Sequence, residues 1–490
     1  MKKSAEVLAI VLAGGEGTRL APLTRQTAKP AMPFHAAHRL IDFALSNLNN
    51  SGIPVVHVLM QYRPESVLRH LDEAWMGAQE GSGCLIHPLV GGTGRLPRFN
   101  GTADAVYQIR QALIEQRPDV VAVFSADHVY RMDVRQMIDF HLQTGADATV
   151  AALPVPCEAA RSFGVMEVGR GRIMRFAEKP QHPLPMPGRP GHALASMGNY
   201  LFAPDVLLQA LEANHAAGGT DFGSHVLPAL LRSSHRLMAY DFTTNVVEGL
   251  DEEGVPHYWR DVGTLDAYFA AHMDTIAPAG KHPAFDLAAP AWPIRGAASA
   301  LAPGRRDWAS GRYPQPATAT NRAQVEQSVL RHGARVGEGA QVFRCIVGDG
   351  VEIGARCRLR NVIVEAGTRL PDGFQAGFDL EEDRERFAVS LGGVVVIPRG
   401  VIEPRVASMA PSRLARLVPG LNRLRSPNAG QGVNGVPGLN AVPSLSGVPS
   451  LSGVPSLNAM PGVAHPGLKN AGGVAGAGAT RRDAEAATPR

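Results

Sequence analysis

The sequence predicts an α/β protein: a Rossmann-like domain built on a doubly wound sheet, then a short hexapeptide β-helix, then a disordered tail. Three observations support this. Apolar strand-like runs alternate with amphipathic segments up to about residue 280, a repeat at every seventeenth position begins near residue 326, and Pro, Gly and Ser dominate after about residue 405. At 490 residues the chain is too long for one ordinary core. We therefore divide it into a sheet domain (1–280), a Pro/Gly/Ala-rich linker (281–325), a β-helix (326–404) and a tail (405–490).

The sheet domain is predicted from its alternating elements. Residues 7–13 (VLAIVLA) are apolar throughout, which is typical of a central parallel strand buried on both faces. Alternation of strands and helices indicates βαβ units, and in such sheets ligands bind at the carboxyl ends of the strands. Strands are predicted over 7–13, 55–60, 120–124 and 148–153, and helices over 41–51, 104–115 and 133–143.

The start of the chain also admits a second interpretation. Met1-Lys2-Lys3 followed by an apolar run resembles a signal peptide, but Glu6 interrupts the entry and the run is short. No run approaches the roughly 20 apolar residues that span a bilayer. We expect a cytoplasmic protein without membrane contact.

The β-helix is predicted from three registers that recur at every seventeenth position. Three sides of about six residues per turn are the geometry of a hexapeptide β-helix, and seventeen rather than eighteen suggests one shortened corner. A chance alignment of common apolar residues is the alternative. The registers are Val329, Ile346 and Ile363; Gly333, Gly350 and Gly367; and Val336, Ile353 and Leu370.

The tail has a six-residue period of its own. Five arginines fall between Arg405 and Arg425, and prolines then recur every six residues from Pro437 to Pro461. A second β-helix would lose a ladder donor at the same height in every turn, so a disordered or polyproline-like segment is favoured.

Composition excludes several classes of function. A net charge of +4 is too small to indicate nucleic-acid binding. The four cysteines, Cys84, Cys157, Cys345 and Cys357, have no CxxC spacing, so neither a metal cluster nor a disulfide framework is expected.

A glycine-rich loop with two cations follows the first strand, in VLAGGEGTRL. Three glycines let backbone amides approach an anion closely, Thr18 adds a hydroxyl and Arg19 a forked cation. Lys29, fixed before Pro30, adds a point charge. The loop is predicted to hold a triphosphate; a plain strand-to-helix turn would explain the glycines but not both cations. The glycines are Gly14, Gly15 and Gly17.

Two acidic residues are candidates for a metal site. Asp127 ends a predicted buried strand in FSADHVY, and Asp261 follows aromatic residues in HYWRDVGT. Carboxylates that meet at one sheet edge would chelate Mg²⁺, although either alone could be a helix cap or an ion pair. Glu178-Lys179-Pro180 repeats the Lys-Pro arrangement of Lys29 and suits a second phosphate.

These motifs resemble a known family. GGxGTRLxPLT…KP, SADH, FAEKP and WRDVG look like the sugar-1-phosphate nucleotidylyltransferases. Further stretches are similar to their ADP-glucose pyrophosphorylase (glucose-1-phosphate adenylyltransferase) branch of bacterial glycogen synthesis, closely over 7–295 and more loosely over 325–400. These stretches are IDFALSNLNNSGI (41–53), GTADAV (101–106), FGVMEV (163–168), ASMGNYLF (195–202), DFGSHVLP (221–228) and YWRDVGTLDAY (258–268).

The resemblance implies a fold, a reaction and an assembly. The fold would be a GT-A-like mixed-sheet nucleotidyltransferase domain followed by a left-handed β-helix. The reaction would join ATP and α-D-glucose 1-phosphate into ADP-glucose and pyrophosphate with Mg²⁺, in a homotetramer.

The resemblance also implies roles for individual residues. Asp127, Lys29 and Arg19 would be catalytic, with Asp127 and Asp261 holding Mg²⁺. Nucleotide-binding residues would be Gly14, Gly15, Gly17, Thr18, Gln61, Gly101, Thr102 and Ala103, and glucose 1-phosphate-binding residues would be Phe99, Gly164, Glu178, Lys179 and Ser196.

The chain departs from the family pattern at several positions. Glu16 stands where the family usually carries Arg, and Phe99 where a tyrosine is expected. The basic residues that bind a sugar-bisphosphate activator fall on Gln26, Thr27 and Pro33, with only Arg39 retained. We therefore expect a different allosteric ligand or none. The β-helix also looks about one coil shorter.

Two other functions remain open at this point. One is a nucleotidylyltransferase for UTP, dTTP or GTP, or for mannose 1-phosphate, which GTADAV and ASMGNY disfavour. The other is a non-catalytic regulatory subunit, which Glu16 favours and the presence of Asp127, Asp261, Lys29 and Lys179 disfavours.

Overall fold

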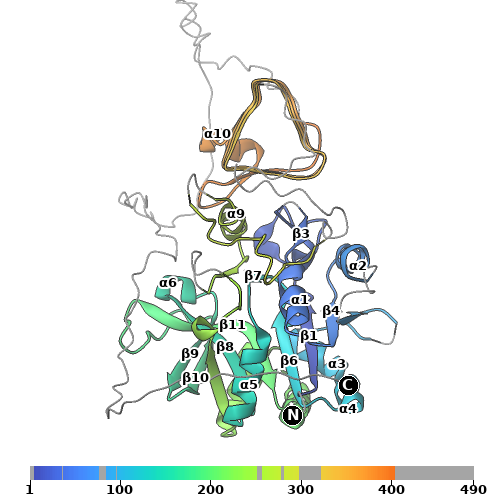
Figure 1. The fold of residues 1–490 in the computed structure, drawn as a ribbon, viewed down its shortest axis with the longest axis vertical. Helices are drawn as coiled ribbons and strands as arrows, with labels where there is room; N and C mark the ends of the chain where they lie inside the picture. The colour runs from blue at the N-terminus through green and yellow to red at the C-terminus, as the bar shows by residue number, and fades with distance from the viewer. Residues whose placement is uncertain are drawn as a thin grey trace, which may run out of the picture. The chain divides into compact units, whose positions relative to one another are not determined.

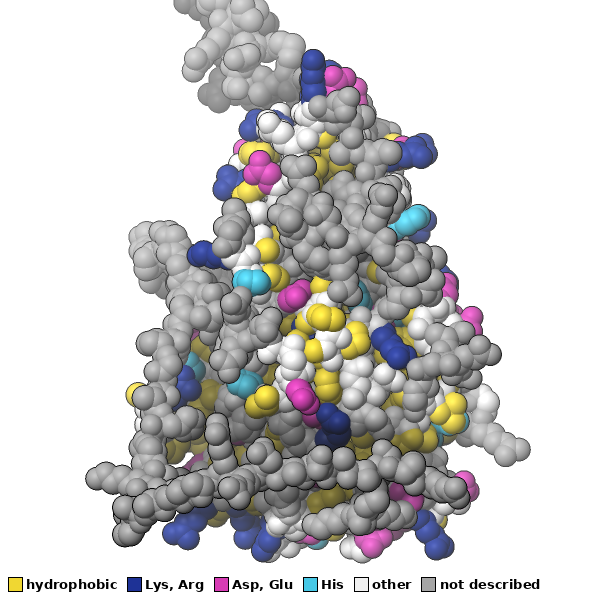
Figure 2. Space-filling view, in the orientation of Figure 1, with side chains coloured by type: hydrophobic (Ala, Val, Ile, Leu, Met, Phe, Trp, Pro, Cys, Tyr) yellow, Lys and Arg dark blue, Asp and Glu magenta, His cyan; other side chains and the backbone are white. Residues whose placement is uncertain are grey.

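The computed structural model describes residues 5–402, except 36, 77–83, 95, 251–256, 278–280 and 297–321. The expected tail and most of the expected linker therefore lie outside the described residues. Within the described part, no helix is long and apolar enough to cross a membrane. Charged side chains of both signs are interspersed over the face drawn in Figure 2, rather than gathered into one basic field.

A mixed sheet forms the centre of the first domain (Figure 1). Among the described residues its nine strands follow the order β5-β4-β1-β6-β11-β8-β12-β10-β9. Strands β5, β4, β1 and β6 are parallel, whereas β11 is antiparallel to both β6 and β8. The β5-β4-β1-β6 side of the sheet is thus entirely parallel, whereas the other side is mixed, with β12 parallel to β8 and antiparallel to β10. Its strands are β1 (Val7–Ala13), β4 (Val55–Met60), β5 (Leu85–Val90), β6 (Val120–Ser125), β8 (Ala148–Pro156), β9 (Gly164–Gly169), β10 (Arg172–Glu178), β11 (His192–Phe202) and β12 (Leu237–Asp241).

Apolar side chains bury both faces of the sheet. Val7 and Val11 of β1 belong to one core cluster with residues of α1, α2 and α5, and Leu8 and Ile10 belong to another with residues of α3, α4, α7 and α8. The continuous apolar run is therefore a central strand. The helices are α1 (Ile41–Asn50), α2 (Pro64–Leu71), α3 (Thr102–Gln108), α4 (Arg110–Gln116), α5 (Val134–Thr144), α6 (Cys157–Ala160), α7 (Pro204–Ala216), α8 (Leu227–Arg232), α9 (Leu265–Met273) and α10 (Leu380–Arg386).

Residues 281–296 contain no helix or strand, yet they are packed. Phe285, Leu287, Trp292 and Ile294 are buried. The indole nitrogen of Trp292 donates to Asn47 Oδ1 at 3.0 Å, which fixes this segment on α1.

The second domain is a left-handed parallel β-helix, seen nearly end-on as a triangle in Figure 1. The predicted registers are confirmed: Val329 pairs with Ile346 and Ile346 with Ile363, and the register of Val336 repeats in the same way. Its strands are β14 (Gln324–Glu326), β15 (Val329–Leu330), β16 (Arg335–Val336), β17 (Gln341–Phe343), β18 (Ile346–Val347), β19 (Glu352–Ile353), β20 (Arg358–Arg360), β21 (Val362–Val364), β22 (Arg369–Leu370), β23 (Gln375–Ala376), β24 (Ala388–Val389) and β25 (Val395–Ile397).

The β-helix core shows where the corner is shortened. Val342, Val347, Ile353 and Leu359 lie in its interior, so successive steps are five, six and six residues. The short step therefore separates β17 from β18. Gly333, Gly350 and Gly367 adopt positive φ (64° to 72°) at equivalent corners, a conformation that glycine adopts without strain.

The outward face of the β-helix packs on the first domain. Ile346 and Ile363 share an apolar cluster with Leu20, Phe34 and Tyr268. Backbone amide and hydroxyl groups of the 390–392 turn also donate to the Asp266 carboxylate at the start of α9. Leu20 directly follows the glycine-rich loop, so the end of that loop belongs to the same apolar cluster as the β-helix.

Candidate active site

Two neighbouring parallel strands bring the first site residues to one edge of the sheet. Strands β1 and β6 pair from Val7 with Val120 to Leu12 with Ser125. Residues 14–19, hereafter the glycine loop, and Asp127 therefore leave the sheet side by side. Beyond them, strands β7 (His128–Tyr130) and β13 (Trp259–Asp261) are antiparallel, and their register sets Asp261 opposite His128.

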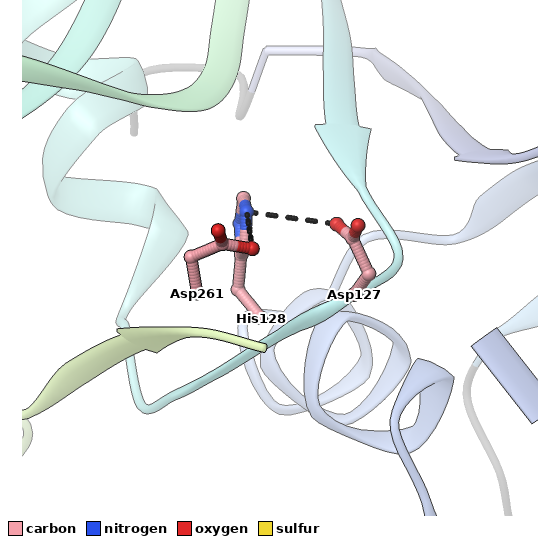
Figure 3. A group of neighbouring side chains, drawn as sticks. All are labelled: Asp127, His128 and Asp261. Carbon is pink, nitrogen blue, oxygen red and sulfur yellow. Dashed lines mark ion pairs between the residues drawn. The ribbon is translucent and has the colours of Figure 1, made fainter. Parts of the chain in front are cut away.

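These pairings assemble a group that we call the carboxylate cluster: Lys29, Ser125, Asp127, His128 and Asp261. Figure 3 shows the imidazole of His128 between the two carboxylates. Its Nε2 atom lies 3.5 Å from Asp127 Oδ1 and 3.8 Å from Asp261 Oδ1. Lys29 Nζ lies 2.6 Å from Asp127 Oδ2 and 3.5 Å from Asp261 Oδ1, and the Ser125 hydroxyl donates to Asp127 Oδ1.

The neighbouring charges in the cluster favour the charged forms of Asp127 and Lys29. Burial favours the neutral form of Asp127, but the charges of Lys29 and His128 and the hydrogen bonds from Lys29 and Ser125 outweigh it and hold its pKa well below the usual range. Burial likewise opposes the ammonium of Lys29, yet Asp127 and Asp261 raise its pKa. Lys29 and Asp127 therefore face each other as ions.

The cluster also has the donor set of a cation site. One carboxylate oxygen from each of Asp127 and Asp261 and one ring nitrogen of His128 lie within 4.8 Å of one another. Carboxylate oxygens suit hard cations such as Mg²⁺, and an added imidazole suits Mn²⁺ and related ions. His128 was missed by the sequence reasoning, although it directly follows Asp127 in SADH.

The glycine loop is a strand-to-helix turn that continues into the 3-10 helix η1 (Thr18–Leu20). Gly17 has φ 65°, and a Cβ there would lie 3.0 Å from Lys29 Cβ, so this glycine is required by the fold. A Cβ at Gly15 would meet nothing within 4 Å, and Glu16 is exposed. Neither a steric contact nor a positive φ therefore requires glycine at position 15.

Arg19 lies near the carboxylate cluster. A Cβ on Gly263 would lie 3.1 Å from the Arg19 guanidinium and 2.7 Å from Asp261 Oδ2. The Arg19 guanidinium and the Asp261 carboxylate therefore border the same glycine, whose missing side chain leaves room for both.

The residues expected near the nucleotide base form a second group. The Gln61 amide donates to Phe99 O at 3.0 Å and accepts from Phe99 N at 2.5 Å, so its polar atoms are used within the protein. Ala103 N donates to Thr220 O, and a Cβ on Gly101 would lie only 2.4 Å from that carbonyl. The Thr102 hydroxyl donates to Asp221 Oδ2 at 2.7 Å.

The residues expected around the sugar form a third group. A Cβ on Gly164 would lie 3.0 Å from Glu178 Oε2, and a Cβ on Gly223 would lie 2.4 Å from the same atom. The absence of a side chain at these two glycines therefore leaves room for the Glu178 carboxylate. Lys179 has φ 45°, its ammonium lies 3.0 Å from Glu178 Oε1, and its side chain is 61% exposed. Glu178 and Lys179 therefore lie together at the end of β10.

Two short connections relate the three groups. Gly223, which approaches Glu178, lies two residues after Asp221, which accepts from Thr102, so this segment links the second group to the third. Ser196 Oγ accepts from Gly198 N at 3.1 Å, and a Cβ on Gly198 would lie 3.5 Å from the His128 ring. Ser196 thus lies beside the segment that backs the carboxylate cluster.

Of the four residues that correspond to the family's activator site, Pro33 and Arg39 lie in a hairpin, whereas Gln26 and Thr27 precede it. Pro33 of β2 (Pro33–Phe34) pairs with Arg39 of β3 (His38–Arg39). The Arg39 guanidinium donates to Ala31 O at 3.1 Å, in the short 3-10 helix η2 (Lys29–Ala31) that precedes the hairpin.

Comparison with known proteins gives the same two-part division. The Nucleotidyl transferase family matches residues 8–277, more than half of the chain, and the family described as GlmU-like, C-terminal hexapeptide matches residues 315–397. The glucose-1-phosphate adenylyltransferase of Anaeromyxobacter sp. (strain Fw109-5) is 41% identical over 419 residues, which cover 82% of this chain and 100% of the relative. The chain belongs to the glucose-1-phosphate adenylyltransferase family.

Other members of the glucose-1-phosphate adenylyltransferase family give similar values. The protein of Mycolicibacterium smegmatis is 41% identical over 410 residues, covering 82% of this chain and 100% of the relative. That of Thermus thermophilus is 41% identical over 415 residues, covering 81% and 98%. As a member of this family the chain is a nucleotidyltransferase, a class of enzyme that uses divalent metal ions.

Proposed function

We propose that this protein transfers the adenylyl group of ATP to α-D-glucose 1-phosphate, giving ADP-glucose and pyrophosphate in the committed step of bacterial glycogen synthesis. The observation that carries the proposal is the joining of Lys29, Asp127 and Asp261 at the edge of the sheet, in a chain that matches glucose-1-phosphate adenylyltransferases over four fifths of its length. We further propose a cytoplasmic homotetramer.

The proposed chemistry requires positioning more than proton transfer. The phosphate of glucose 1-phosphate is ionised at pH 7, so one of its oxygens attacks the α-phosphorus of ATP without a general base. A bond forms between that oxygen and phosphorus, and the bond to the β-phosphate oxygen breaks as pyrophosphate leaves. The residues must align the two phosphates and compensate the charge that develops between them.

The glycine loop is the proposed cradle of the departing pyrophosphate. Gly15 leaves open space over its backbone, and Arg19 and Lys29 supply positive charge beside it. Glu16 brings an anion to the same loop, and its exposure allows its side chain to turn away from a triphosphate. Gln61 and Gly101–Ala103 are the proposed wall of the base site.

Asp127 and Asp261 are the proposed holders of Mg²⁺. Their oxygens and the chemistry of the donor set fit this ion. When bound there, Mg²⁺ would neutralise negative charge at the α-phosphate. On the other side, Lys179 is the proposed partner of the sugar phosphate and Glu178 of the sugar hydroxyls, with Phe99, Gly164 and Ser196 lining the site.

Substrate specificity is tested by measuring pyrophosphate release with each pair of nucleoside triphosphate and sugar phosphate. We expect ATP with glucose 1-phosphate to be the preferred pair; a clear preference for UTP, or for mannose 1-phosphate, would refute the assignment. Asp127→Asn should mainly lower kcat, while the matched variant Asp205→Asn, at an exposed position in the first turn of α7, should leave it unchanged.

A regulatory subunit is the second candidate, favoured by Glu16 alone. It predicts no turnover by the purified chain, together with an increase in the activity of a catalytic partner. Turnover by the purified chain would exclude it.

A further inference from the structure

The two carboxylates proposed to hold the cation are already compensated by groups of the protein. Lys29 Nζ faces Asp127 Oδ2 and Asp261 Oδ1, at 2.6 and 3.5 Å. The Ser125 hydroxyl donates to Asp127 Oδ1, and His128 Nε2 lies near one oxygen of each carboxylate. The remaining oxygen, Asp261 Oδ2, borders Gly263 beside the Arg19 guanidinium.

The ammonium of Lys29 is held firmly in this position. The Lys29 side chain is 10% exposed. Its aliphatic stem packs against Gly17, because a Cβ on Gly17 would lie 3.0 Å from Lys29 Cβ. Lys29 also begins the short 3-10 helix η2 (Lys29–Ala31), with Pro30 next in the chain. The ammonium group therefore has few positions available to it other than the one beside the two carboxylates.

An ammonium and a divalent cation compete for the same oxygens. Both need Asp127 and Asp261, and they repel each other if both are present at contact distance. A triphosphate relieves this conflict, because its oxygens can accept from Lys29 and ligate the cation at once.

We propose that Lys29 is an internal counter-ion that weakens the binding of free divalent cations to Asp127 and Asp261, so that the cation binds mainly together with a nucleoside triphosphate. This inference rests on the proposed function, since it concerns the same site. Nucleotide and cation then raise each other's affinity, because coupling between two ligands is reciprocal. The cation reaches the site as its complex with the triphosphate rather than ahead of it.

The test is the affinity of the full-length, nucleotide-free protein for Mn²⁺, measured from the loss of the free-ion signal in electron paramagnetic resonance. Removing the competing charge in Lys29→Met should tighten Mn²⁺ binding by about tenfold or more. Lys29→Arg keeps the charge and should bind Mn²⁺ as weakly as the wild type. If Lys29→Met binds Mn²⁺ no more tightly than the wild type, the proposal is wrong.

A double variant locates the effect. In Lys29→Met/Asp261→Asn the gain in Mn²⁺ affinity should disappear, because one of the two carboxylates is gone. A gain that survives would belong to another site and would also overturn the proposal. Circular dichroism checks that each variant is folded; should Lys29→Met not fold, Lys29→Gln keeps a donor beside Asp127 and should show a gain in the same direction.

Turnover of ATP and glucose 1-phosphate by the wild type is measured on the same preparation. That assay tests the proposed function, whereas Mn²⁺ binding tests the competition with Lys29. An active wild type with unchanged Mn²⁺ affinity in Lys29→Met would refute the inference and leave the proposed function standing.

Discussion

Replacing Gly223 by alanine perturbs the proposed sugar site through one defined contact. Gly223 is buried in the short π-helix η4 (Phe222–Val226), and the new Cβ would lie 2.4 Å from Glu178 Oε2. Since Cβ atoms essentially never approach other atoms within 3.0 Å, Oε2 must move by at least about 0.6 Å (3.0 − 2.4). The Glu178 carboxylate is the end of a flexible side chain, so it moves and the fold is retained.

The displacement should be visible as a selective loss of sugar affinity. A hydrogen bond from a sugar hydroxyl to a charged carboxylate contributes about 1.5–3 kcal/mol, so the KM for glucose 1-phosphate should rise roughly tenfold to a hundredfold. The KM for ATP and the melting temperature should stay unchanged. Steady-state kinetics with each substrate varied in turn measures this.

Gly191→Ala is the matched control. A Cβ there would meet nothing within 4 Å, and Gly191 has no positive φ. We expect wild-type KM values for both substrates. An unchanged KM for glucose 1-phosphate in Gly223→Ala would show that Glu178 does not contact the sugar, and would refute the reasoning.

Three further predictions concern charge. Lys179→Ala should raise the KM for glucose 1-phosphate roughly tenfold or more, and far more than that for ATP, because a phosphate loses a charged donor; equal increases in steady-state assays would contradict its placement. Glu16→Arg should lower the KM for ATP several-fold, and an unchanged value would show that this exposed side chain faces away from the nucleotide. Burial lowers the pKa of His57 and His141 to about 4 and that of His272 to about 3. Between pH 6.5 and these values the unfolded chain therefore binds protons that the folded chain does not, and the melting temperature should fall as pH drops through this window; calorimetry from pH 7.5 to 4.5 that shows no decrease would contradict this.

The elements that the sequence predicted well are those whose burial follows a simple period. Residues 7–13 and 55–60 begin and end as strands where expected, because the first run is apolar throughout and the second is interrupted only by His57. The registers of the β-helix were confirmed because interior side chains and corner residues recur together. In both cases a single repeating environment selects the residues.

The elements that were missed have no such period. Strand β10 exposes charged residues such as Arg172 and Arg175, and β11 changes register between Ser196 and Tyr200. The expected helix over 104–115 is divided into α3 and α4 at Ile109, whose φ and ψ are −107° and 11°. These features depend on neighbours that lie far away in the sequence.

The candidate site shows the same contrast. That Asp127 and Asp261 meet was predicted from the rule that ligands gather at carboxyl ends of strands, and the structure brings both within reach of Lys29. The position of His128 between them depends on the pairing of β7 with β13, which no local pattern reveals. The close approach of Gly223 in η4 to Glu178 at the end of β10 likewise joins two elements that are distant in the sequence.

The period of the β-helix restricts how its length can change. Because each wall recurs at every seventeenth position, as in the pairing of Val329 with Ile346, deletion or duplication of one whole coil keeps all three walls aligned. A change of another length within the walls would bring later residues out of register. Extra chain can instead be looped out at a corner: Val396, almost two periods after Ile363, still pairs with it, so the added segment that contains α10 is inserted without breaking the ladder. Whole-coil gain or loss and corner insertions are thus the two routes by which this domain can vary in size.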